Sequence, residues 1–109
     1  ADLTKAVLNN SDLSFAKLIG ADLAKATLDS VDLRGATLIR ADLRKASLIL
    51  TNLSEADLTE ARLSGTMLAS ANLNNAILAK RCRATRSHLN RGTIAGCKFA
   101  ECSFVSSEL

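Results

Sequence analysis

A leucine recurs at every fifth position through most of this chain, and this spacing constrains the fold more than any other sequence feature. Positions five apart drift around an α-helix by about 140° and therefore share no face. On a flat strand, an odd spacing sends successive side chains to opposite faces. The predicted core leucines are Leu3, Leu8, Leu13, Leu18, Leu23, Leu28, Leu33, Leu38, Leu43, Leu48, Leu53, Leu58, Leu63, Leu68, Leu73 and Leu78.

A small residue recurs in step with the leucines. It stands two positions before each of them and is alanine everywhere except at Ser11, Val31, Thr51 and Thr66. The other three positions of each five-residue unit carry almost all of the charge, so we expect them to face water. Fixed self-similarity of this kind is typical of solenoids. The chain is therefore predicted to turn back toward a common axis every five residues.

The surface residues indicate how many sides each coil has. Lysine recurs every twenty residues at Lys5, Lys25 and Lys45. From Asp2 to Asn72 an acidic or amide residue precedes every second leucine, except at Arg62. This alternation gives uniform columns if a coil holds twenty residues, whereas a three-sided coil would mix acidic and other residues in each column. We therefore predict a four-sided coil, with successive coils about 4.8 Å apart.

The units "ADLTK", "ADLAK", "TNLSE" and "ANLNN" resemble the A(D/N)LXX repeats of the pentapeptide-repeat family. The resemblance implies an all-β fold, a right-handed quadrilateral β-helix, here of about five coils. We expect a regular β-helix over residues 1–80. Over residues 81–109 we expect a register-shifted continuation. The five-residue spacing of apolar residues resumes at Leu89, which lies eleven residues after Leu78 and not ten.

The cysteines invite a sharper interpretation. Cys82 lies twenty residues before Cys102, so a disulfide between stacked coils is one alternative, although parallel stacking keeps the Cβ atoms farther apart than a disulfide prefers. Small buried residues in place of alanine are the other alternative, and this interpretation also suits Cys97. A zinc site that also includes His88 lacks the close cysteine pair typical of such sites, so we predict no metal.

The sequence offers little for catalysis. His88 is the only histidine, and the chain has no phosphate-binding glycine loop. We expect the aspartate columns to accept hydrogen bonds from turn amides and to be neutralised by nearby Lys and Arg. We therefore predict no enzyme activity, no cofactor and no small-molecule substrate. No apolar run approaches the length of a membrane span, so we also expect a soluble protein without a span.

Positive charge is concentrated late in the chain. The net charge is +3, and no acidic residue lies between Glu60 and Glu101. This basic segment suggests contact with an anionic partner, or a solvated edge that keeps other copies away. Nucleic acid is not expected, because no aromatic residue is interleaved with the basic ones. The candidate binding residues of this segment are Lys80, Arg81, Arg83, Arg86 and Arg91.

Outward aliphatic residues give a second set of candidate contacts. Ile19 and Ile39 are predicted to stack on one face, and Ile49 and Leu50 on the opposite face.

We interpret the chain as a non-catalytic scaffold that binds a protein partner, with an end-to-end homodimer as one arrangement. The family resemblance also implies an alternative, the topoisomerase-binding DNA mimics of the quinolone-resistance type. It further suggests a cyanobacterial or plastid source, with a cytoplasmic or thylakoid-lumen location.

The inward and outward assignments predict very different responses to substitution. Leu43→Asp should abolish cooperative unfolding, because it would place a carboxylate in the interior column. Lys25→Ala should change the free energy of unfolding by less than about 0.5 kcal/mol, because Lys25 faces water. Urea unfolding followed by circular dichroism measures both. Equal effects of the two substitutions would contradict the assignment.

Overall fold

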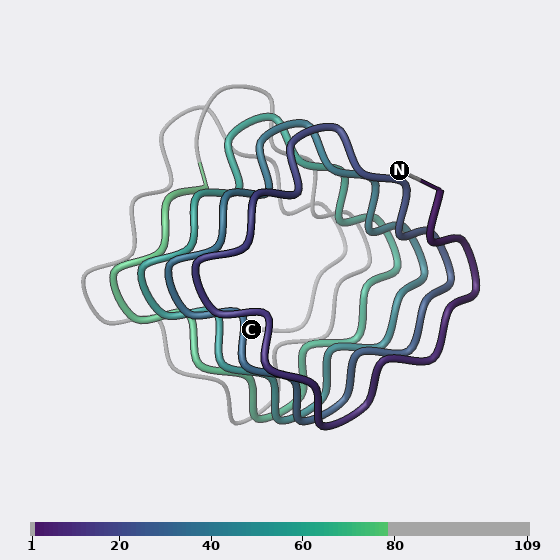
Figure 1. Cartoon of the computed structure of the whole chain (residues 1–109), viewed down its shortest axis with the longest axis horizontal. Coiled ribbons are helices and arrows are strands. Elements are labelled where there is room, and N and C mark those ends of the chain that lie inside the picture. The colour runs from purple at the N-terminus through teal and green to yellow at the C-terminus, as the bar shows by residue number, and fades with distance from the viewer. Residues whose placement is uncertain (1, 79–109) are drawn as a thin grey trace.

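The computed structural model describes residues 2–78, which wind into a column of stacked four-sided coils (Figure 1). Within these residues, β-structure consists of isolated parallel bridges rather than long strands. Each bridge joins a residue to the one twenty positions later, as in Asp2 with Asp22 and Asp22 with Asp42. This spacing confirms that one coil takes twenty residues and has four five-residue sides.

Each side ends in a tight turn that begins at its leucine. The leucine carbonyl accepts a hydrogen bond from the amide three residues later, as from Ala26 to Leu23 at 3.0 Å. The second residue after the leucine has a positive φ, 62° at Lys25, as a type II turn requires at that position. These corner residues are Lys5, Asn10, Phe15, Gly20, Lys25, Ser30, Gly35, Arg40, Lys45, Leu50, Glu55, Glu60, Gly65, Ser70 and Asn75.

Backbone hydrogen bonds between coils use most of the remaining amides. The Leu23 amide donates to the Asp42 carbonyl at 2.8 Å, and the Lys25 amide donates to the Arg44 carbonyl at 2.9 Å. In the other direction, the Asp42 amide donates to the Ala21 carbonyl at 2.9 Å. Because the middle coils satisfy these groups internally, their faces present side chains rather than a free sheet edge.

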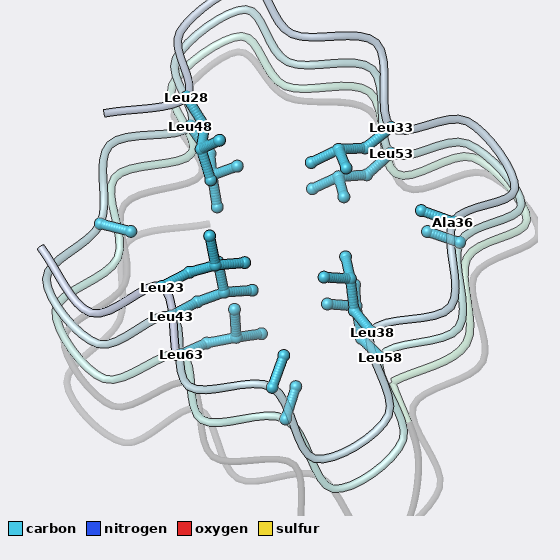
Figure 2. Close-up of a cluster of buried hydrophobic side chains, with 14 of the residues drawn as sticks. Leu23, Leu28, Leu33, Ala36, Leu38, Leu43, Leu48, Leu53, Leu58 and Leu63 are labelled. Atoms are coloured by element: carbon cyan, nitrogen blue, oxygen red, sulfur yellow. The ribbon is translucent and has the colours of Figure 1, made fainter. Parts of the chain in front are cut away.

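The core is a set of four leucine columns around the axis. Figure 2 shows Leu23, Leu43 and Leu63 in one column, with Leu28 and Leu48, Leu33 and Leu53, and Leu38 and Leu58 in the others. These leucines are at most 2% exposed. The leucines of the first coil, Leu3, Leu8, Leu13 and Leu18, are half-buried and pack against the core, because a described coil covers only one side of them.

Two threonines occupy interior positions that in most other units hold alanine. The Thr51 hydroxyl donates to the Leu28 carbonyl at 2.7 Å, and the Thr66 hydroxyl donates to the Leu43 carbonyl at 2.7 Å. Both residues are at most 1% exposed. Since a buried hydroxyl without a partner would cost about 1–3 kcal/mol, these bonds explain how the interior column tolerates threonine.

One corner carries an aromatic side chain. Phe15 is 64% exposed, and its ring extends toward the corner of the next coil. A Cβ added to Gly35 would lie 2.5 Å from two ring carbons, so the ring occupies space that only glycine leaves open. The Arg34 guanidinium lies 5.6 Å from the ring centroid, within the range of a cation–π contact.

Alanine substitutions at Gly20 and Gly35 allow the cost of backbone strain to be measured separately from the cost of losing this ring contact. Gly20→Ala should lower the free energy of unfolding by about 1 kcal/mol, because alanine is strained at positive φ and nothing lies within 4 Å of the added Cβ. Gly35→Ala should cost about 0.5 kcal/mol more, because it also displaces the ring from Arg34. Urea unfolding measures both variants. In a Phe15→Ala background the two costs should become equal; equal costs with Phe15 present would contradict the observed ring position.

Candidate functional site

The candidate site is the outer surface of the column, which has four faces. The basic candidates Lys80, Arg81, Arg83, Arg86 and Arg91 lie outside the described residues, as do His88 and the three cysteines. Each face is defined by the outward residues that precede its leucines and form parallel bridges. These are Asp2, Asp22, Asp42 and Arg62 on face 1; Val7, Thr27, Ser47 and Met67 on face 2; Asp12, Asp32, Asn52 and Asn72 on face 3; and Lys17, Thr37, Asp57 and Ile77 on face 4.

The carboxylates of faces 1 and 3 are bound to their own turns. Asp2 accepts hydrogen bonds from the Thr4 hydroxyl at 2.6 Å and the Thr4 amide at 3.1 Å. Asp12 accepts the same pair from Ser14, at 2.6 and 3.0 Å. These hydroxyl bonds, followed by the amide bonds, hold the pKa of each carboxyl below its usual value. Such groups remain ionised at neutral pH, so they are poorly suited to act as general acids.

Asp42 differs because it also forms an ion pair. Arg44 binds it with two nitrogens, Nε to Oδ1 at 2.9 Å and Nη2 to Oδ2 at 2.7 Å. The Arg44 side chain is therefore the main cause of the lowered pKa of Asp42, and Asp42 in turn raises the pKa of Arg44. Among residues 2–78, this is the only ion pair. The ion pair stabilises the turn and occupies both side chains.

Face 2 has no aspartate before its leucines, and there a side chain from the neighbouring coil accepts the hydrogen bond from the turn amide. The Asp29 amide donates to Asn9 Oδ1 at 3.1 Å, one coil away. Asp29 Oδ1 then accepts from the Ile49 amide at 3.1 Å and from the Ser47 hydroxyl at 2.5 Å. Asp29 is therefore a structural acceptor at the corner that follows face 2.

The four predicted aliphatic contacts fall on opposite sides of the column. Ile19 and Ile39 lie at the corner after face 4, where Ile19 is 52% exposed and Ile39 is half-buried. Ile49 and Leu50 lie at the corner after face 2, where Leu50 is 62% exposed and Ile49 is half-buried. The structure thus brings the four residues together as two pairs and not as one patch.

Sequence reasoning did not identify Phe15 as a surface residue of interest. The sequence feature that could have indicated the position of the ring is Gly35, which stands twenty residues after Phe15 and hence one coil further along the same corner. A glycine at that position leaves room for an aromatic ring to lie across the corner.

Two classes of site have no support among the described residues. No group of His, Cys, Asp or Glu side chains in that part of the chain is arranged to hold a metal ion. Across the same residues, no helix has the length and apolar character needed to span a membrane.

Comparisons with known proteins agree with this architecture. A family model for pentapeptide repeats matches residues 1–35, 26–65 and 46–80, in eight copies. The solved structure of Rfr23, a pentapeptide repeat protein from the cyanobacterium Cyanothece 51142, is 27% identical with a TM-score of 0.80, covering 98% of this chain and 82% of Rfr23. A comparison with curated protein sequences gives no match.

Two further solved structures are similar to this chain. HetL, a pentapeptide repeat protein involved in heterocyst differentiation regulation in the cyanobacterium Nostoc sp. strain PCC 7120, is 27% identical with a TM-score of 0.76 over 99% of this chain. The chain spans 59% of the length of HetL. A pentapeptide repeat protein of the Arabidopsis thaliana thylakoid lumen is 27% identical, with a TM-score of 0.64, covering 94% of this chain and 67% of that protein. These likenesses confirm the right-handed quadrilateral β-helix expected from the sequence.

The ion pair at Asp42 predicts a specific pH dependence. Because folding lowers the pKa of Asp42, its ionised form stabilises the folded state above about pH 4, and this contribution is lost as the pH falls further. Asp42→Asn should therefore reduce the decrease in free energy of unfolding between pH 6 and pH 2.5. The asparagine can keep the turn hydrogen bond, as Asn52 does with the Ser54 amide at 3.0 Å. An unchanged pH profile, measured by urea unfolding, would contradict this role.

Proposed function

The chain belongs to the pentapeptide-repeat family, and we propose that it is a non-catalytic scaffolding module whose flat faces bind a protein partner. The observation that carries the proposal is that different positions of each five-residue unit have different structural roles. The leucine and the small residue fill the core, while the backbone amides and the aspartates hold the turns and the stack. The other outward side chains stand in straight columns at a fixed spacing and have no structural task in common.

This arrangement suits recognition better than chemistry. A rigid face presents its side chains without the entropy cost of ordering a loop, which favours affinity for a partner of complementary shape. The aspartates that could have formed paired catalytic carboxylates accept turn hydrogen bonds instead, as Asp12 does. The proposal therefore assigns the chain a binding role and no reaction.

The charge distribution weighs against the alternative of DNA mimicry. Mimicry of a duplex needs a surface of uncompensated negative charge. Residues 2–78 carry nine acidic and eight basic side chains, and the lysine column Lys5, Lys25 and Lys45 stands beside the aspartates of face 1. We therefore expect no inhibition of DNA gyrase in a supercoiling assay, and inhibition would favour the alternative.

The likeness to two cyanobacterial proteins and a thylakoid-lumen protein also supports a photosynthetic source for this chain. We propose either the cytoplasm or the thylakoid lumen as its location.

Photo-crosslinking tests the scaffold directly. A benzophenone amino acid placed singly at Asp22, Thr27, Asp32 or Thr37 samples each face at the same level of the column. In extract of the source organism, a scaffold should crosslink to a protein from one or two faces, while the remaining faces give little product. Equal crosslinking from all four faces, or none from any, would contradict the proposal.

A further inference from the structure

Face 2 differs from the other faces in having no charge along its centre. Its outward residues are Val7, Thr27, Ser47 and Met67, whereas each of the other three faces carries at least two charged residues among those described. Thr27 and Ser47 are small, so the centre of the face is flat. Depletion of charge at the centre is the compositional signature of a protein interface.

Exposed apolar side chains also gather around this face. Among the described residues, five large hydrophobic side chains are exposed, and three of them belong here: Val7 at 72%, Leu50 at 62% and Met67 at 45%. Val7 and Met67 lie in the central column, and Leu50 lies at the corner that follows it. The half-buried Ile49 adjoins Leu50. Val7, Leu50 and Met67 therefore lie on one side of the column, around a face whose centre is uncharged, and exposed apolar side chains gathered in this way favour an interaction site.

Leu50 is the least expected of these residues. It occupies a corner with φ of 60°, where a bulky residue is strained. Phe15, the other bulky apolar residue at a corner, packs over Gly35 and contacts Arg34. Leu50 instead keeps most of its side chain in water. Since the turn requires a positive φ at every corner, what distinguishes Leu50 is an apolar side chain that folding leaves in water, and contact with a partner would cover it.

The opposite edge of face 2 is a column of positive charge. Lys5, Lys25 and Lys45 occupy the corner that precedes the face, and all three are exposed. Their ammonium groups form no ion pair with any of residues 2–78. Successive coils place them about 4.8 Å apart. At the other edge, Asp29 is the one charged residue among those described, and it is half-buried and accepts bonds from Ile49 and Ser47. The three lysines outnumber it, so the net charge along the edges of this face is positive and is concentrated on one side.

From this arrangement we infer that face 2 binds a protein segment that is apolar at its centre and carries a row of carboxylates along one side. The inference rests on the proposed scaffold function and specifies its partner. The apolar centre of the segment covers Val7, Leu50 and Met67, and its carboxylates meet the lysine column. A nucleic acid fits less well, because its phosphates would lie over an uncharged, apolar strip.

Selection from an unbiased peptide-display library tests the chemistry of this partner. The full chain is the bait, and Thr27→Glu and Thr37→Glu are matched variants. These two threonines lie in the same coil, are both half-buried and outward-facing, and belong to opposite faces. Selected peptides should be enriched in both acidic and apolar residues. They should bind Thr27→Glu at least tenfold more weakly than the unsubstituted chain, and Thr37→Glu with unchanged affinity. Circular dichroism verifies that both variants fold.

The lysine column gives a second, independent readout. Replacing Lys5, Lys25 and Lys45 together by glutamine should weaken the selected peptides about tenfold, because each exposed ion pair contributes a factor of about two. The same replacement should reduce the salt dependence of binding, since three charge pairs are removed. The matched control replaces by glutamine Lys17, Arg34 and Arg40, which lie on face 4 and its two corners, on the opposite side of the column from face 2, and should leave affinity within twofold.

Several outcomes would overturn the inference. Basic or uncharged selected peptides would do so, as would binding that is lost in Thr37→Glu rather than Thr27→Glu. Binding of phosphatidylglycerol vesicles that Thr27→Glu abolishes would assign face 2 to a membrane surface and reject the protein segment. Peptides that bind another face would overturn this inference but leave the scaffold function standing. No binding peptide for any face would contradict both.

Discussion

The quarter turn after every interior leucine is the constraint on which the rest of the structure depends. Each turn places a residue such as Lys25 at positive φ, which costs a residue other than glycine about 1 kcal/mol. In exchange, the next side begins in the right direction for its own leucine to reach the axis. Burial of one leucine contributes about 2 kcal/mol. This gain exceeds the cost of the turn only when neighbouring coils cover the leucine fully. The stack is therefore cooperative, and each coil depends on the coils beside it.

The same turn determines which residues are free for function. Hydrogen bonds within the turn and between coils use the backbone, as Leu23 shows with Asp42. Aspartates before leucine are used to hold the turn amides, as Asp12 does with Ser14. What remains is a surface of straight columns whose composition the sequence can vary without disturbing the core. The uncharged centre of face 2, beside its lysine column, is one such variation, and it is where we place the partner.

Much of this architecture could be predicted from the sequence, because the period of five admits few folds. The alternation of aspartate before leucine was enough to choose four sides over three. The positive φ at the corners could also have been predicted, since Gly20, Gly35 and Asn10 all stand two residues after a leucine and are the residue types that adopt it most readily. The ring of Phe15 over Gly35 was harder to foresee, because it depends on the direction in which an exposed side chain leans along the column. A partner cannot be predicted at all from periodicity, since it depends on the surface of a second molecule.

The register of twenty residues between coils is tested most directly by scalar couplings across hydrogen bonds. In a long-range HNCO spectrum of the labelled protein, the amide of Leu23 should couple to the carbonyl carbon of Asp42, to which it donates at 2.8 Å. The amide of Leu28 should couple likewise to Ser47. Couplings from Leu23 to Thr37 and from Leu28 to Asp42, as a three-sided coil would give, would contradict the four-sided column and everything inferred from its faces.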